Sequence, residues 1–457
     1  MYKKNTYLPV QTEFSSYDNC KMLLSMEGYD SLYGGPRPNG SSKSWYFKEK
    51  GRIEPPTNLG HWNFFDEYGK WFDNKTLRSQ HQPHVIDQHH CHYKYKEELV
   101  GQEHLYVITV FNPHYFKQNR EIGFSVIDEQ YQKDVREGRA YIILFYPWEG
   151  YSGMEGNSDF IIVEEWRKKA KFPPKSVHFV TGNLTADYHE HNKHGNIVFH
   201  TLSTFDNWNS DTADIPPVTF EPDEDKYLYL TYNRNPRKNR VYLGCKLMEH
   251  DLLDKGLISL GKPEWLNSGN VLRQDGVRDK EWSDLTRKLP LELGKNLHFN
   301  LACNVTHEDY TKTFCSIVTE TLIEDGTVFL SEKTWKCFQV GHPFFLLGNK
   351  HTLKYLRNQG YQTFNEWWDE SYDDVNDYRL RVNSIIREVE RFSKYSKEDL
   401  KIIRNEMDDV LKWNKKHHYE GLVSRWGFHQ TEKPLWVLDK FHSLYIELVN
   451  RNKNVLI

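Results

Sequence analysis

Residues 313–348 read TFCSIVTETLIEDGTVFLSEKTWKCFQVGHPFFLLG, and this segment decides the fold that the sequence predicts. Its two apolar runs, 314–319 and 343–347, have the length and composition of buried strands. Between them, residues 329–334 have the character of a turn that leads into a helix, and a further helix is expected over 351–358. The order strand, helix, strand, helix is typical of a parallel sheet covered by helices. Such sheets bind ligands where their strands turn into helices.

The length and charge of the chain limit its class. With 457 residues it is too long for one ordinary core, so two domains are expected. The formal net charge of −4 provides no overall attraction for nucleic acid, although the sequence is compatible with a local basic patch. The six cysteines are scattered without a C-x-x-C pair, as in the reduced, buried thiols of a cytosolic protein. No signal-peptide pattern and no apolar stretch of about 20 residues is present, so a cytoplasmic protein without a membrane span is expected.

Strand and helix patterns divide the chain into two α/β domains and a helical tail. The first domain, residues 1–210, begins with an irregular segment rich in aromatic residues and histidines. Strands are expected over 105–111, 140–147, 176–183 and 196–202 in the first domain, and over 227–233 and 257–261 early in the second. A polar, proline-bearing linker over 211–226 separates the first domain from the second, residues 227–375. Apolar stripes at helical spacing predict that the tail, residues 376–457, is helical.

Four charged residues of the second domain are candidates for binding a pyrophosphate-linked donor. Arg240 and Lys333 each open a predicted helix, where a cation and a helix N-terminus together attract a diphosphate. The carboxylates of Glu320 and Glu332 are suited to accept hydrogen bonds from ribose or sugar hydroxyls. Judged by spacing alone, ordinary acids at helix starts and a solvated lysine are the favoured explanation.

The segment around these residues resembles the donor-binding motif of the α1,3-fucosyltransferases. In that motif an apolar strand ends in Glu-Asn, after which come an aromatic residue, Thr-Glu-Lys, a helix and a small-residue turn into a strand that reads Pro-aliphatic-Leu-Gly. Glu320 matches the first acid, and Glu332 and Lys333 match the Glu-Lys pair. Residues 343–348 match the final strand, and Arg240 resembles the arginine that these enzymes place on the donor phosphates.

The sequence also departs from the fucosyltransferase motif at three places. Ser331 stands in place of threonine, Thr321 stands in place of asparagine, and residues 322–328 are an insertion. These differences leave the identity of the sugar open. The chain further resembles glycosyltransferase-like proteins of large tailed phages, through Arg-Asn-Pro-Arg at 234–237, Gly-Tyr-Gln-Thr-Phe at 360–364 and the acidic run at 369–373. If the chain is phage-encoded, the expected cytoplasm is that of the host.

These resemblances imply a glycosyltransferase of the GT-B type, in which two Rossmann-like domains face a cleft. The C-terminal domain would hold a UDP- or GDP-linked sugar as co-substrate, through Arg237, Arg240, Glu320, Ser331, Glu332 and Lys333. The resemblance also implies transfer that inverts the anomeric centre and requires no bound metal ion or other cofactor. The acceptor stays open between hydroxymethylated phage DNA, a protein and a glycan.

Transfer of this kind needs a general base, which the N-terminal domain is expected to supply. Glu149 is the candidate, because it follows the apolar run 140–147 and parallel sheets present functional groups after such strands. An exposed loop acid is the ordinary alternative for this residue. Asp128 and Glu190 are weaker candidates for the same role.

Three further patterns suggest other chemistry. The histidine-rich segment 81–92 suggests a zinc site, and with it a zinc hydrolase, although no second pair of ligands has recognisable spacing. The acids at 223–225 match a metal-binding Asp-x-Asp, but they lie in the expected linker, where solvated charge is the better explanation. The basic clusters 234–240 and 412–418 are suited to DNA phosphates. A binding protein that kept the GT-B fold and lost turnover is the remaining alternative.

Overall fold

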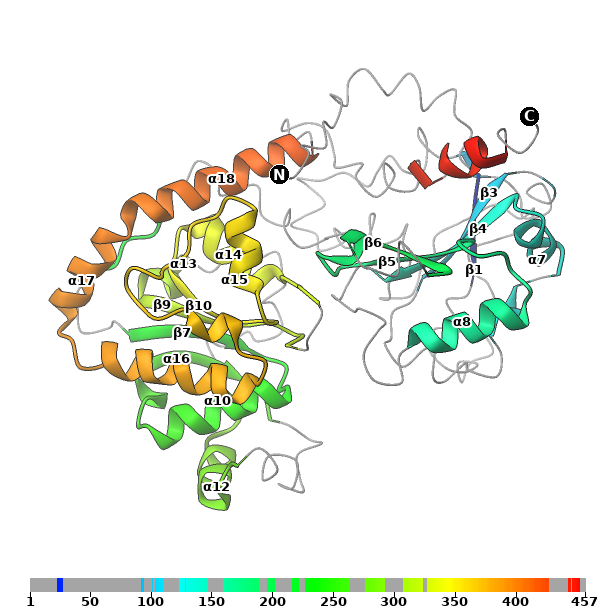
Figure 1. Ribbon diagram of the computed structural model, residues 1–457. Helices are drawn as coiled ribbons and strands as arrows, with labels where there is room; N and C mark the ends of the chain where they lie inside the picture. The colour runs from blue at the N-terminus through cyan, green and yellow to red at the C-terminus, as the bar shows by residue number, and fades with distance from the viewer. Residues whose placement is uncertain are drawn as a thin grey trace. The chain divides into compact units, whose positions relative to one another are not determined.

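The computed structural model describes residues 23–27, 92–93, 101, 103–109, 123–127, 129–146, 159–188, 195–201, 216–221, 227–262, 276–291, 307–323, 327–426, 443–444 and 446–452. By their internal contacts, residues 1–203 and 423–457 form a first unit, and residues 204–422 form a second. Both units have the mixed α/β architecture with parallel sheets that the sequence predicts (Figure 1).

The first unit is built on a six-stranded parallel sheet in the order β2-β1-β3-β4-β5-β6. Its strands are β1 (Leu23–Glu27), β2 (His92–Tyr93), β3 (His104–Thr109), β4 (Ala140–Tyr146), β5 (Val177–Thr181) and β6 (Ile197–Thr201). The last four confirm the strands predicted for this part of the chain. All five residues of β5 are buried, as expected for an apolar strand inside a helix-covered sheet.

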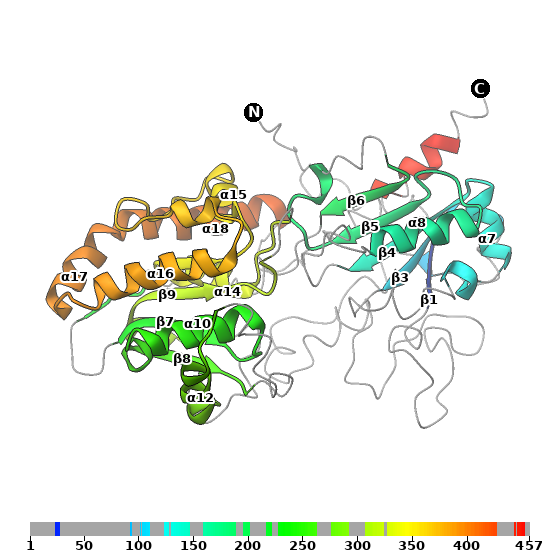
Figure 2. The ribbon, with the colours of Figure 1, turned by 60° about the horizontal axis from the view of Figure 1, so that its bottom comes forward.

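Short helices cover the first sheet. They are η2 (Gly123–Val126), α7 (Glu129–Arg136), α8 (Asp159–Lys169) and η3 (Ala186–Tyr188). Helix α8 lies along the strands β4 to β6 in both views (Figures 1 and 2). Phe160 of α8 contacts Phe199 of β6 with ring centroids 6.0 Å apart, so aromatic packing holds this helix on the sheet.

The second unit is built on a four-stranded parallel sheet in the order β10-β9-β7-β8. Its strands are β7 (Tyr227–Asn233), β8 (Gly256–Leu260), β9 (Thr313–Thr319) and β10 (Phe344–Leu347), which confirms the predicted strands of this half. Every residue of β9 and β10 is buried. The two strand segments quoted at the outset therefore form part of the core, because helices cover both faces of this sheet.

Helices follow each strand of the second sheet. They are α10 (Lys238–Glu249), η5 (Leu253–Lys255), α12 (Asp279–Lys288), α13 (His307–Thr311), α14 (Glu332–Val340), α15 (Thr352–Asn358), η8 (Ser371–Asp374), α16 (Tyr378–Phe392), α17 (Lys397–Glu406) and α18 (Asp408–Trp426). Helices α10 and α16 lie side by side on one face of the sheet, and α14 lies on the other face beneath α18 (Figure 1). Among the described residues, no helix has both the length and the apolar composition needed to cross a bilayer.

Helices α16 to α18 belong to the second unit as far as residue 422, although the sequence suggests a separate tail from residue 376. The predicted stripe on α16 is buried at Val382, Ile385, Ile386 and Val389. Phe392 at the end of α16 contacts Phe314 of β9, with ring centroids 5.2 Å apart. The tail helices therefore complete the core of the second unit, because their apolar stripes have no core of their own to fill.

Part of the expected linker, residues 216–221, packs against the second unit. The amide of Val218 donates to the carbonyl of Val340 over 2.8 Å. The Val218 carbonyl accepts a hydrogen bond of 2.8 Å from Arg404, whose guanidinium is buried. Phe220 contacts the ring of Phe314. These six residues are thus a fixed strap on the second unit.

Candidate functional site

Polar side chains gather where β7, β8 and β9 end. The strands are parallel, so their carboxyl ends meet at one edge of the sheet. Asn233, the last residue of β7, accepts a hydrogen bond from the hydroxyl of Thr319 at the end of β9. The backbone amide of Asn233 donates to the hydroxyl of Ser259 on β8 over 3.1 Å. This network holds the three strand ends in register beneath the candidate site.

Glu320 follows β9 directly and is completely buried. Its Oε1 accepts hydrogen bonds from the amide of Ser331, at 3.0 Å, and from the hydroxyl of Thr334, at 2.6 Å. Its Oε2 has no hydrogen-bond partner among the described residues. Burial raises the pKa of Glu320 above its ordinary value, although the Lys333 charge and both hydrogen bonds act in the opposite direction. The structure therefore places a buried carboxyl group below the first turn of α14.

Ser331, Glu332 and Lys333 form the start of α14. Ser331 is the N-cap, and its hydroxyl accepts a hydrogen bond from the Lys333 amide. The Lys333 ammonium lies 2.6 Å from Glu332 Oε1 and 3.3 Å from the Ser331 hydroxyl. Burial disfavours the charged form of Glu332, but attraction to Lys333 and Lys336 outweighs it and holds the pKa of Glu332 below its ordinary value. The expected Glu-Lys pair is therefore an ion pair at a helix N-terminus.

Arg240 lies at the same edge, but its side chain is buried and bonded to the backbone. It is 3% exposed. Its two terminal nitrogens donate to the carbonyls of Asn235, at 2.9 Å, and Thr319, at 3.2 Å. The guanidinium therefore joins the loop after β7 to the end of β9.

The loop between β7 and α10 presents the more exposed cations. Arg234 is exposed, and Arg237, the N-cap of α10, and Lys238 are half-buried. A Cβ at Gly261 would lie 2.3 Å from the Arg234 carbonyl oxygen, which accepts a hydrogen bond from the Gly261 amide. Only glycine permits this close approach, so Gly261 sets the position of the basic loop against the end of β8.

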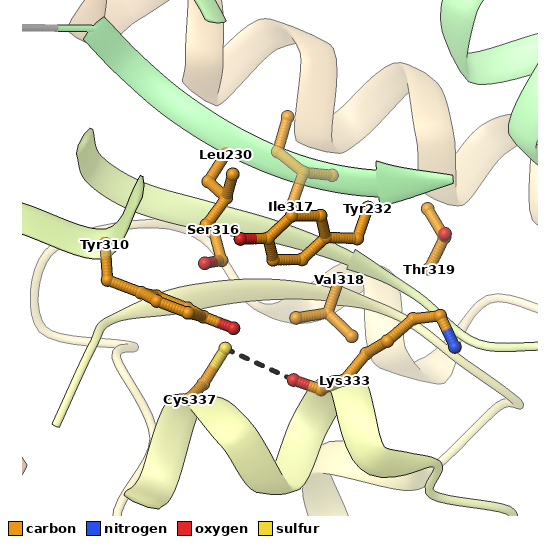
Figure 3. A pocket seen from close by; sticks show the side chains of 9 residues that line it. All are labelled: Leu230, Tyr232, Tyr310, Ser316, Ile317, Val318, Thr319, Lys333 and Cys337. Atoms are coloured by element: carbon orange, nitrogen blue, oxygen red, sulfur yellow. Dashed lines mark hydrogen bonds between the residues drawn. The ribbon is translucent and has the colours of Figure 1, made fainter. Parts of the chain in front are cut away.

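A small hollow opens between β7, β9 and α14 (Figure 3). It is lined by Leu230, Tyr232, Tyr310, Ser316, Ile317, Val318, Thr319, Lys333 and Cys337. Its cavity volume is about 10 Å³, which is room for about one water molecule. Figure 3 shows the Lys333 ammonium on the side of Thr319, away from Tyr310 and Cys337. A ligand of nucleotide size has to lie outside this hollow, where the lysine points.

The Cys337 thiol in the hollow is held in its protonated form by burial. Burial raises its pKa to about 12, so the reactive thiolate is scarce at neutral pH. Its Sγ donates to the Lys333 carbonyl oxygen over 3.5 Å. Cys245 and Cys315 are also buried and reduced, as the scattered cysteines predict.

Several residues that the sequence suggests lie outside the described part of the chain. They are the base candidates Glu149, Asp128 and Glu190, the histidines from 81 to 90, and the acids 223–225. Of the histidine-rich segment the structure describes only the backbone of His92, in β2. The structure therefore brings together the residues around the start of α14 that the sequence suggests, and the base and the zinc site stay predictions.

The basic cluster 412–418 on α18 combines two exposed ion pairs with one buried lysine. Lys412 pairs with Asp408 at 2.5 Å, and Lys416 pairs with Glu420 at 3.7 Å. Lys415 is buried and donates to the carbonyl of Gln339. Lys412 and Lys416 are mostly exposed despite these ion pairs, so contact of this cluster with DNA phosphates stays a prediction.

Two buried cations of the tail helices were missed by sequence reasoning. Arg381 of α16 donates to the carbonyls of Gly348 and Ile323, so it holds the loops that follow β10 and β9. Arg404 of α17 donates to the carbonyls of Val218 and Gly341, and burial lowers its pKa to about 9. In the sequence these two residues stand out only as arginines that lie next to the apolar stripes of α16 and α17.

The acidic run 369–373 serves the local fold. Asp373 accepts hydrogen bonds of 3.0 Å from the amides of Leu353 and Lys354, and so caps α15. Glu370 accepts from the amide of Phe364 and pairs with Arg357 at 3.0 Å. These acids therefore fix the turn that follows α15 and are no part of the strand-end cluster.

Comparison with models of known protein families and with curated protein sequences finds no match to this chain. The argument for function therefore depends on the residues at the carboxyl edge of the second sheet. Their arrangement unites a lysine, two carboxylates, a helix N-terminus and an adjacent basic loop.

Proposed function

We propose that this protein is a glycosyltransferase that moves a sugar from a nucleotide-sugar donor to an acceptor hydroxyl. The observation that carries the proposal is the position of Lys333, Glu332 and Glu320 around the N-terminus of α14. This is the edge of a parallel sheet at which such folds bind nucleotides. The resemblance of the same residues to the fucosyltransferase donor motif supports the choice of donor.

The leaving diphosphate is the group that these cations suit. Negative charge grows on it as the bond to the sugar breaks, and fixed positive charge nearby lowers the barrier. Lys333 supplies one cation, and the helix N-terminus adds backbone amides. Arg234, Arg237 and Lys238 form the neighbouring basic loop and provide further contacts. Arg240 supports this loop from beneath, because its terminal nitrogens already donate to two backbone carbonyls.

The two carboxylates suit the hydroxyls of the donor. Glu332 is partly exposed and ionised, so it accepts hydrogen bonds from ribose or sugar hydroxyls. Glu320 is completely buried, so it acts through Ser331 and Thr334, which it positions at the start of α14. The pair would orient the donor while Lys333 engages its phosphate.

The proposal includes the GT-B arrangement, with the donor held by the second unit and the acceptor by the first. A base takes the proton of the acceptor hydroxyl as its oxygen attacks the anomeric carbon, and the bond to the diphosphate breaks with inversion. Glu149 is the proposed base. The acceptor is hydroxymethylated phage DNA, a protein or a glycan, and transfer is expected to continue in the presence of a metal chelator.

The proposal is tested first by thermal unfolding in the presence of a panel of UDP- and GDP-sugars. A donor should raise the unfolding midpoint, because a ligand that binds only the folded state stabilises it. Mass spectrometry of candidate acceptors after incubation with the stabilising donor then identifies the product. Binding without any transfer would favour a non-catalytic nucleotide-binding protein. Absence of stabilisation by every nucleotide would refute the proposal.

A further inference from the structure

Lys333 and Glu332 are adjacent in sequence and neutralise each other at the start of α14. Their charged atoms are 2.6 Å apart, and each side chain is only 17% exposed. The Ser331 hydroxyl also accepts a hydrogen bond from the Lys333 ammonium, at 3.3 Å. An anion that approaches Lys333 must therefore separate it from the Glu332 carboxylate or lie beside that carboxylate.

Glu332 also competes with an approaching anion for the positive N-terminal end of α14. It is the first residue of this nine-residue helix, where a carboxylate is favoured by the helix dipole. From the buried side, Glu320 already accepts hydrogen bonds from Ser331 and Thr334. The second oxygen of Glu320 has no partner among the described residues, so an acceptor atom there awaits a hydrogen-bond donor. Two carboxyl groups thus flank the helix start, and the ionised one, Glu332, repels a bare anion.

We propose that Glu332 determines specificity by excluding phosphates that carry no hydroxyl groups. A bare pyrophosphate that takes Lys333 leaves the Glu332 carboxylate, which is only 17% exposed, without its ion-pair partner and close to like charge. A nucleoside diphosphate compensates, because its ribose hydroxyls donate to the carboxylate that Lys333 releases. In this exchange of partners, Lys333 leaves Glu332 for the phosphate and the ribose hydroxyls take its place on Glu332. The inference rests on the proposed function and deepens it, since it names nucleoside diphosphates with an intact ribose diol as the preferred ligands.

Isothermal titration calorimetry on the full chain tests the exchange. The probes are UDP, GDP, their 2′,3′-dideoxy analogues and inorganic pyrophosphate. The native protein should bind UDP or GDP about a hundredfold more tightly than pyrophosphate. Glu332→Gln should bind pyrophosphate about tenfold more tightly than the native protein and lose its preference for the ribose diol. Glu398→Gln, which removes the same charge from the exposed first turn of α17, should change each affinity by less than about twofold.

The outcomes separate the two proposals. If the native protein binds UDP or GDP but Glu332→Gln gains no affinity for pyrophosphate, the exclusion by Glu332 is refuted and the donor site is retained. If neither nucleotide nor pyrophosphate binds to the native protein or to the variant, both are refuted. Glu332→Ser, with a residue favoured at helix starts, is the second variant and must show the same gain. Circular dichroism and thermal unfolding establish that each variant is folded.

Discussion

The Thr334 hydroxyl donates to the Glu320 carboxylate over 2.6 Å, and this bond ties the residue after β9 to the first turn of α14. Both residues are completely buried. The Ser331 amide donates to the same oxygen, so one carboxylate positions the N-cap and the first turn together. The lysine of the candidate site therefore depends on an acid that lies beneath it.

Thr334→Val should destabilise the second unit while preserving its shape. The substitution removes a buried hydrogen bond to a carboxyl group, which contributes about 1.5–3 kcal/mol to the free energy of unfolding when that group is charged. Urea unfolding at neutral pH measures the loss. Thr286→Val is the matched control, because the Thr286 hydroxyl donates to a carbonyl on an exposed helix. Equal losses in the two variants would show that Glu320 does not hold the start of α14.

Lys333→Ala should abolish donor turnover without unfolding the protein. Removal of a cation that stabilises developing charge lowers kcat/KM by about a hundredfold to a thousandfold. Release of the nucleoside diphosphate from the donor sugar, followed over time, measures the loss. Lys354→Ala is the control, since Lys354 is an exposed lysine in the first turn of α15. Full activity of Lys333→Ala would contradict the assignment of the donor site.

His342 should make the stability of the second unit depend on pH. Its Nε2 donates to the Thr313 carbonyl and its Nδ1 accepts from the Ser316 hydroxyl, each over 3.0 Å. Burial lowers the pKa of His342 to about 3, far below its ordinary value of 6.5.

The folded protein keeps His342 neutral between those two values, whereas the unfolded chain takes up a proton. The stabilisation is therefore complete above pH 6.5 and is lost progressively as the pH falls toward 3. One such proton gives a slope of about 1.4 kcal/mol per pH unit in the free energy of unfolding. Urea titrations from pH 7 to 4 should show a shallower slope for His342→Gln than for the native protein. Parallel slopes would exclude His342 as the source.

Gly341→Ala should release the strap 216–221 from the second unit. Gly341 ends α14 with φ 66°, and a Cβ there would lie 2.5 Å from Pro217 Cβ. The left-handed backbone alone costs a non-glycine residue about 1–2 kcal/mol, and the clash adds to it. Gly276→Ala is the control, because Gly276 has φ 82° and nothing within 4 Å of its would-be Cβ. Gly341→Ala should lower the unfolding midpoint more than Gly276→Ala. Equal effects would refute the close approach of Pro217 to Gly341.

Sequence reasoning located four of the six strands of the first sheet and all four strands of the second, because their apolar runs are bounded by polar turns. It missed β1 and β2, which lie in the segment expected to be irregular. Residues 314–319 and 343–347 correspond to β9 and β10, and the predicted helix at 351–358 corresponds to α15. The same reasoning separated the tail at residue 376, since periodicity shows that a helix is amphipathic without showing which core receives its stripe. Contacts with β9 and α10 assign α16 to the second unit.

The sequence predicted which residues gather at the candidate site, and the structure corrected the role expected of Arg240. Glu320, Ser331, Glu332 and Lys333 lie together because α14 begins at the edge where β9 ends, and the Ser331 amide and Thr334 hydroxyl there donate to Glu320. Arg240 was expected to face the donor, yet it is buried and bonded to backbone carbonyls. Sequence spacing cannot tell whether a cation at a helix start is buried or faces a ligand. Its exposure depends on how closely the neighbouring strand approaches the helix.

The sequence by itself determined the parallel α/β architecture and the Glu-Lys pair at the start of a helix, because apolar runs and capping residues act locally. Only the tertiary structure decided that Glu320 lies beneath that helix and that Arg240 is bonded to two backbone carbonyls. It also decided that Arg381 and Arg404 hold the surrounding loops. These contacts join residues that are up to 186 positions apart, so they exist only once the sheet has brought the strand ends together.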